Sequence, residues 1–285
     1  MHHHEILATI TIAHHFKSAF NREQLFRYLK SKIDKKTFHI TIDKLVREKI
    51  VFERNNLLFA EDIEEICHKK KSWSKALFKK NIKYLWFLSK LPWIKYIGLT
   101  GANSFESCNK DDDIDLFIIT SPDRLWICYL AIVLITKLTR KRQTLCVNYL
   151  IDENNLEITE KSYFTAVQII QMMPVFDNGH HKKLIEENPW IFKILPNANS
   201  SNNEDSFYLL KRVNNPNKEK TISLTMLSNV NRKIYKLYAK RLEEKFPESF
   251  GKGILLSEGM AKLNRIENHD IYENLFKNIY EAMNP

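Results

Sequence analysis

An Asp-x-Asp pair, Asp113-Ile114-Asp115, opens a run of β-forming residues, and this feature constrains the chain more than any other. Side chains at positions i and i+2 of a strand project from the same face, so the two carboxylates converge. Two adjacent carboxylates repel each other, and the arrangement becomes favourable when a hard divalent cation such as Mg²⁺ lies between them. The pair predicts a metal site where a strand opens into a cleft, although an acidic loop ahead of a strand would give the same pattern.

The residues around the pair alternate between strand and helix signals. A buried helix is expected over 123–139, with Ser121 as its N-cap and Pro122 at its first position. Its apolar stretch of about 12 residues is too short for a membrane span, which needs ~20. Strands are expected over 94–99, 114–120 and 144–151. The order strand, loop, strand, helix, strand predicts an α+β core with a mixed sheet flanked by helices.

A short turn follows the first of these strands directly. Its residues are Thr100-Gly101-Ala102-Asn103-Ser104, and glycine is rare in this chain, with six residues in all. A glycine with short polar neighbours lets backbone N–H groups approach a triphosphate closely. The chain has no GxGxxG and no GxxxxGK[ST] motif, which excludes the Rossmann, P-loop and kinase types of nucleotide site.

The first 66 residues predict a separate module of three helices and a β-hairpin. Asn21 with Gln24 has the form of a capping box, and Asp34 can cap the third helix. Two β-prone runs flank Arg54-Asn55-Asn56, which indicates a hairpin. This order of elements is typical of a winged helix, a module that contacts DNA, RNA or another protein.

Basic charge is concentrated in the same third of the chain. Residues 1–90 contain 19 Lys and Arg against 10 Asp and Glu, a net charge of +9 within a total of +10. Such asymmetry indicates an anionic partner, RNA or DNA being the usual one, although a solvated basic surface gives the same count. The basic residues on or beside the third helix and the hairpin are Lys35, Lys36, Lys44, Arg47, Lys49 and Arg54.

The remaining segments are expected to be mostly helical. An amphipathic linker helix is predicted over 67–92, and the core is expected over 93–200. The segment 196–206 is the most linker-like in the chain, and 201–285 predicts a C-terminal helical region with helices over 218–246 and 271–283. The apolar stripe expected on the linker helix comprises Trp73, Leu77, Ile82, Leu85 and Trp86.

The cysteines and the N-terminal residues indicate the cellular compartment that is expected for the protein. Four scattered cysteines without a CxxC motif argue against a zinc site and against a disulfide framework, so a reducing cytoplasm is expected. The first residues lack the basic start and the cleavage site of a signal peptide, and no membrane association is expected.

The segment "LTGANSFESCNKDDDIDLFIIT" resembles the signature of the DNA polymerase beta superfamily of nucleotidyltransferases: a strand, a Gly-Ser-type turn and then Asp-x-Asp inside an apolar strand. The likeness to bacterial nucleotidyltransferase-domain proteins covers about residues 90–200. It implies transfer of NMP from an NTP to an acceptor with release of pyrophosphate. Asp113 and Asp115 would hold Mg²⁺ or Mn²⁺, and Gly101, Ala102 and Ser104 would bind the nucleotide.

Two departures from the family pattern bear on activity. Ala102 replaces the usual serine, and the third carboxylate that the following strand usually supplies is replaced by Asn148, unless Asp152 or Glu157 serves instead. Three functions therefore stay open. The acceptor is RNA or another macromolecule, or it is a small molecule or signalling nucleotide. The third alternative is a catalytically degenerate fold that acts as a winged-helix regulator or toxin-antitoxin component.

Overall fold

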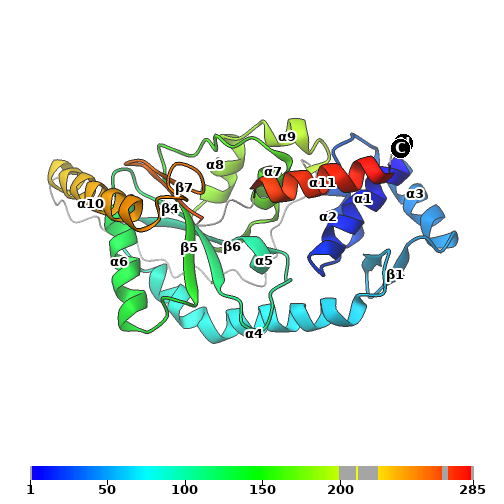
Figure 1. Ribbon diagram of the computed structural model, residues 1–285, viewed down its shortest axis with the longest axis horizontal. Coiled ribbons are helices and arrows are strands. Elements are labelled where there is room, and N and C mark those ends of the chain that lie inside the picture. The colour runs from blue at the N-terminus through cyan, green and yellow to red at the C-terminus, as the bar shows by residue number, and fades with distance from the viewer. Residues whose placement is uncertain (1, 199–209, 211–223, 265–268, 284–285) are drawn as a thin grey trace.

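The computed structural model describes residues 2–198, 210, 224–264 and 269–283 (Figure 1). The helices are α1 (His2–His15), α2 (Arg22–Tyr28), α3 (Lys35–Arg47), α4 (Glu64–Leu88), α5 (Gly101–Ser104), α6 (Leu125–Leu138), α7 (Tyr163–Gln171), α8 (His180–Glu186), α9 (Ile191–Ile194), α10 (Leu224–Lys245) and α11 (His269–Met283). The strands are β1 (Phe52–Arg54), β2 (Leu57–Phe59), β3 (Ile94–Leu99), β4 (Ile114–Thr120), β5 (Leu145–Asp152), β6 (Met173–Asp177), β7 (Ile254–Leu256) and β8 (Met260–Leu263).

A mixed sheet with strand order β6-β3-β4-β5-β8-β7 forms the centre of the molecule. Strands β4 and β5 are parallel, because α6 connects them, and the other neighbours are antiparallel. Alternation along β4 sends Ile114, Leu116 and Ile118 into one hydrophobic cluster and Phe117 and Ile119 into another. The expected α+β class, with a mixed sheet flanked by helices, is confirmed.

The N-terminal module contains the expected three helices and the hairpin. The Asn21 capping box is present, and the Asp34 carboxylate accepts a hydrogen bond from the Thr37 N–H at 2.9 Å. Asn55 and Asn56 adopt positive φ at the hairpin turn, as the tight connection between β1 and β2 requires. The core of this module continues into the hydrophobic cluster on one face of the central sheet.

Two helices far apart in the sequence, α1 and α11, lie side by side and cover this same region (Figure 1). Phe16 at the end of α1 meets Tyr272 of α11 edge to face, with ring centroids 5.1 Å apart. Tyr163 of α7 packs on Phe276 of α11 and donates a hydrogen bond to the Tyr28 carbonyl at 2.9 Å. The N-terminal and C-terminal segments therefore close over the sheet together.

The apolar stripe expected on helix α4 is buried only in part. Leu85 is fully buried, whereas Trp86 is 46% exposed and Ile82 36% exposed. The buried face passes through Leu85 and follows the helical repeat from Cys67 to Leu88. The buried residues of α4 are Cys67, Ser74, Phe78, Asn81, Leu85 and Leu88.

The N-terminus of α6 is capped differently from the expectation. The helix begins at Leu125, after Asp123 in a positive-φ conformation, so neither Ser121 nor Pro122 occupies the expected position. The Asn231 side-chain oxygen, from α10, accepts hydrogen bonds from the Trp126 N–H at 2.8 Å and the Ile127 N–H at 3.4 Å. A residue more than 100 positions away therefore satisfies the first amides of α6.

The segment after residue 160 contains three strands that the sequence did not predict. Strand β6 adds to the β3 edge, and β7 and β8 form a hairpin that extends the sheet beyond β5. The C-terminal region is therefore not purely helical, although helices α10 and α11 match the expected ones within the described residues. Most of the linker-like segment, 199–206, lies outside the described residues. Within the described part of the chain, no helix is long and apolar enough to span a membrane.

Candidate functional site

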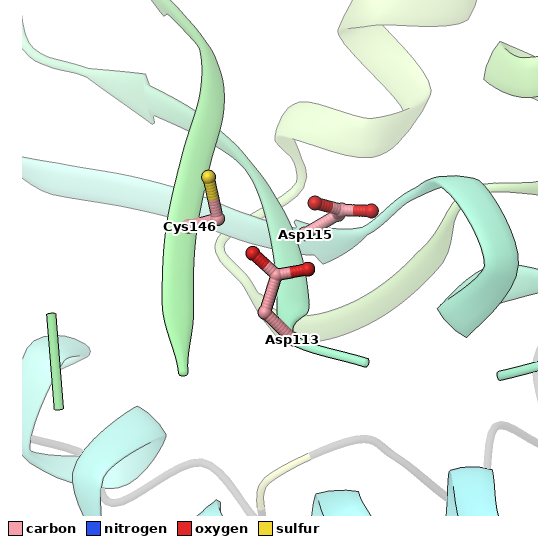
Figure 2. Close-up of side chains that lie close together, drawn as sticks. All are labelled: Asp113, Asp115 and Cys146. Carbon is pink, nitrogen blue, oxygen red and sulfur yellow. The ribbon is translucent and has the colours of Figure 1, made fainter. Parts of the chain in front are cut away.

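Asp113 and Asp115 lie where β4 begins, beside the start of the parallel strand β5 (Figure 2). Asp115 is opposite Cys146 in the register of the two strands. One carboxylate oxygen of each aspartate and the Cys146 sulfur all lie within 4.8 Å of one another. The expected convergence of the two carboxylates is therefore present, and Cys146 adds a third donor atom that the sequence analysis did not assign to the site.

A chain of hydrogen bonds connects these residues through Asn148. The Cys146 thiol donates to the Asn148 side-chain oxygen at 3.1 Å, and the Asn148 amide nitrogen donates to Asp115 Oδ1 at 2.6 Å. The pairing of β4 with β5 shifts between Leu116 and Phe117, so Asn148 has no partner in the register. Asn148 therefore lies at the acid pair, where it was expected in place of a third carboxylate, and a bulge in the strand pairing accompanies it.

The electrostatics of the pair are unfavourable for a second negative charge. Burial and the neighbouring charge of Asp113 together raise the pKa of Asp115 to about 7, against the hydrogen bond from Asn148, which lowers it. A carboxylate this costly to ionise is stabilised when a cation binds beside it. The site therefore has the electrostatic character of a cation site.

Gly101 lies directly against this pair. It has φ +57°, and a β-carbon at this position would lie 2.8 Å from Asp115 Oδ2. Only glycine combines this backbone conformation with so close an approach. The Gly101 N–H donates to the Gln168 side-chain oxygen at 3.1 Å, so α7 helps to fix the turn.

Of the other two residues expected to bind nucleotide, one lines the cavity beside the acid pair and one does not. Ala102 lines the cavity beside the acid pair, whereas Ser104 does not. Ser104 is fully buried, and its hydroxyl donates to the Gly101 carbonyl at 2.9 Å. Ser107 lines the cavity near the position where a hydroxyl was expected.

Neither Asp152 nor Glu157 supplies the missing carboxylate. Asp152 pairs with Thr120 at the far end of β5, and its side chain accepts from the Asn154 N–H and from Asn155 within a turn. Glu157 is exposed and forms an ion pair with Lys161 at 2.9 Å. The proposal of Asp152 as a ligand is wrong, because six residues of extended strand, about 20 Å, separate it from Cys146.

A cavity of about 1040 Å³, here called the acidic cavity, opens over Asp113 and Asp115. Its walls come from the sheet, the Gly101 turn and several helices that the sequence places far apart. The residues that line it include Ile12 and Ala13 of α1, Phe164 and Gln168 of α7, and Tyr272 and Phe276 of α11. A volume of this size, lined by aromatic groups with a few convergent polar ones, suits a cofactor or substrate of nucleotide size.

One ion pair in the wall of the acidic cavity was not found by the sequence analysis. Lys262 of β8 donates to Glu160 Oε2 at 2.6 Å, and the Lys262 side chain is 8% exposed. Both residues line the cavity, together with Lys17 and Lys70. No sequence signal marked Lys262, because β8 itself was not predicted.

The basic residues of the N-terminal module are largely paired within the module. Lys35 contacts Glu23 at 3.2 Å, Lys44 contacts Glu48 at 3.7 Å, and Arg54 contacts Glu64 at 3.2 Å. Arg47 donates to the Asp43 carbonyl. Lys35, Lys44 and Arg54 are therefore held by acids of the same module.

The chain matches no protein-family model, no curated protein and no solved structure at a significant level. The assignment of the site consequently depends on its own geometry.

Proposed function

We propose that this protein is a metal-dependent nucleotidyltransferase that transfers NMP from an NTP to an acceptor and releases pyrophosphate. The observation that carries the proposal is the contact of Gly101 with Asp115. A positive-φ glycine packed against one of two converging carboxylates leaves room for a triphosphate beside the cation that they would hold. The resemblance of residues 90–200 to the DNA polymerase beta superfamily supports the same reading.

The donor atoms at the site fit one Mg²⁺ or Mn²⁺. Magnesium takes one or two carboxylates from the protein and fills its remaining positions with water and phosphate oxygens. Asp113 and Asp115 supply these carboxylates, whereas the Cys146 sulfur is a softer ligand that magnesium disfavours. When bound, the cation would neutralise charge on the reacting phosphate.

The acidic cavity supports a nucleotide as the molecule that meets this cation. Phe16, Phe164 and Tyr272 supply aromatic faces, and the rings of Phe164 and Tyr272 stack 4.4 Å apart. Such faces accept a purine or pyrimidine ring without regard to its hydrogen-bonding groups. Lys17 and Lys70 also line the acidic cavity and supply positive charge.

The order of elements supports a winged helix for residues 1–66, placed beside the acidic cavity. Helix α1 contributes directly to the cavity wall, through Thr9, Ile12 and Ala13. We therefore assign this module a structural part in the substrate site, and we regard contact with RNA or DNA as its second role.

A pyrophosphate-release assay tests the proposal. The protein is incubated with each of the four NTPs, Mg²⁺ or Mn²⁺, and a cell extract as the source of acceptor. We expect turnover by the wild-type protein and its loss in Asp115→Asn. Asp111→Asn is the matched control, because Asp111 is exposed and lies outside both the acid pair and the acidic cavity. Pyrophosphate release that persists in Asp115→Asn would contradict the proposal.

A further inference from the structure

A second cavity, of about 610 Å³, adjoins the acid pair on its other side. It lies between α6 and α10, and four basic side chains line it: Lys137, Arg142, Arg241 and Lys245. Among the described residues that line it, Asp113 is the single acidic one. We call it the basic cavity.

The four cations are not neutralised by neighbouring acids. Within the described part of the chain, none of the four forms an ion pair with a carboxylate, in contrast to the paired cations of the N-terminal module. Lys240, one position from Arg241 but outside the cavity, does pair with Glu244 at 3.9 Å. The positive charge that faces the basic cavity is therefore available to an anionic ligand.

The two helices place these cations together by their packing. Tyr129 of α6 meets Tyr238 of α10 edge to face at 5.2 Å, and Trp126 packs on the same tyrosine. Lys137 is two turns beyond Tyr129, and Lys245 is two turns beyond Tyr238, so both lysines continue the faces that meet. Aromatic rings and cations therefore line the same cavity, and Arg142 lies beside Tyr129.

The basic cavity and the acidic cavity share Asp113, Cys146 and Leu263 in their walls. A ligand in the basic cavity would consequently lie beside Asp113, whereas Gly101 and Asp115 line the acidic cavity alone. The helix pair α6 and α10 also lies at the other end of the molecule from α3 and the β1–β2 hairpin (Figure 1). A ligand at this site is therefore independent of any partner of the N-terminal module.

We infer that the basic cavity binds a phosphorylated small molecule of nucleotide size, with its phosphates on Arg142, Arg241, Lys137 and Lys245 and its ring against Tyr238 and Phe246. Guanidinium and ammonium groups match phosphate oxygens, and the volume suits one small ligand. The identification of this ligand as the acceptor rests on the proposed function, whereas its binding to the basic cavity does not depend on that function.

Equilibrium binding to the full chain in EDTA tests the inference. EDTA removes divalent metal and so prevents metal-dependent binding of a nucleotide in the acidic cavity. The probes are ADP, pyrophosphate and adenosine. We expect saturable binding of ADP and pyrophosphate that weakens with salt, and no binding of adenosine. Arg241→Gln/Lys245→Gln is expected to weaken ADP binding by about tenfold or more.

Lys233→Gln/Lys236→Gln is the matched control, since it removes the same charge from exposed positions of α10 that do not line the basic cavity. It is expected to bind ADP as the wild type does. The inference is overturned if ADP does not bind in EDTA, if both double variants weaken binding equally, or if only a single-stranded oligonucleotide binds. Loss of pyrophosphate release in Asp115→Asn with unchanged ADP binding would separate the two proposals.

Discussion

The α-carbon of Gly101 approaches the carboxylate of Asp115 so closely that a β-carbon would lie 2.8 Å from Oδ2. Gly101→Ala is therefore expected to displace Asp115 and to abolish nucleotide turnover. It also places alanine at φ +57°, which costs about 1–2 kcal/mol of stability. Urea unfolding and pyrophosphate release measure the two effects separately.

Gly251→Ala is the matched control for this substitution. Gly251 has φ +79°, and a β-carbon there meets no atom within 4 Å. The variant is expected to lose a similar backbone stability but to keep full activity. Equal activity of the two variants would show that the contact with Asp115 has no functional role.

Asn148→Asp tests the missing third carboxylate. The substitution removes the N–H that donates to Asp115 at 2.6 Å and adds a charge beside two others, so it should destabilise the metal-free protein by about 1–3 kcal/mol. Added Mg²⁺ should restore this loss and bind more tightly than to the wild type. Urea unfolding with EDTA or Mg²⁺ checks both effects, with Asn154→Asp, at the exposed far end of β5, as control. Tighter binding of Mg²⁺ to the wild type would contradict the prediction.

Asp115 should make the metal-free protein less stable as the pH rises. Its pKa is raised to about 7 by burial and by Asp113, so the folded state holds a proton that the unfolded chain releases between about pH 4 and 7. The contribution of Asp115 to stability therefore falls across this window as pH increases. Asp115→Asn removes the effect and is expected to stabilise the protein at pH 8 by at most about 4 kcal/mol. Thermal unfolding in EDTA at pH 5 and pH 8 measures it, and equal pH slopes for the two proteins would contradict the assignment.

His14 should have the opposite pH dependence. Its Nδ1–H donates to the Ser18 carbonyl at 3.2 Å, and its Nε2 accepts from the Ala60 N–H at 2.9 Å, which joins α1 to the segment after β2. Burial lowers the pKa of His14, so the folded state resists a proton that the unfolded chain accepts below about pH 6.5.

The contribution of His14 to stability should therefore fall between pH 7 and pH 5.5, by up to about 1.4 kcal/mol per pH unit, and it opposes the contribution of Asp115 in the same range. His14→Asn should be less stable at pH 7 but should lose less on acidification. Urea unfolding at several pH values tests this, with His15→Asn, an exposed position on the same helix, as control. An unchanged slope in His14→Asn would show that this histidine does not carry the effect.

The local features of the site could be read from the sequence because they depend on short-range rules. The convergence of Asp113 and Asp115 follows from the two-residue repeat of a strand, and the caps at Asn21 and Asp34 follow from side chains close to the amides that they satisfy. The Asn55-Asn56 turn is likewise specified by residues that tolerate positive φ.

The features that the sequence did not predict depend on tertiary structure. The bulge in the pairing of β4 with β5 was not predicted, although Asn148 itself lies beside Asp115, where it was expected. The cap of α6 comes from Asn231, and Lys262 reaches the cavity from the short strand β8, which pairs with β5. The exposed Trp86 shows the same limit, because the hydrophobic repeat of α4 does not specify which face its neighbours cover.

Manganese binding tests directly whether Asp113 and Asp115 hold a divalent cation, because it requires no knowledge of the acceptor. Electron paramagnetic resonance would measure free Mn²⁺ during titration of the wild type, Asp113→Asn/Asp115→Asn and the control Asp111→Asn, each with a non-hydrolysable NTP analogue. We expect saturable binding of Mn²⁺ to the wild type and to the control, and a loss of about tenfold or more in Mn²⁺ affinity for the double variant. Equal affinity of all three proteins for Mn²⁺ would contradict it.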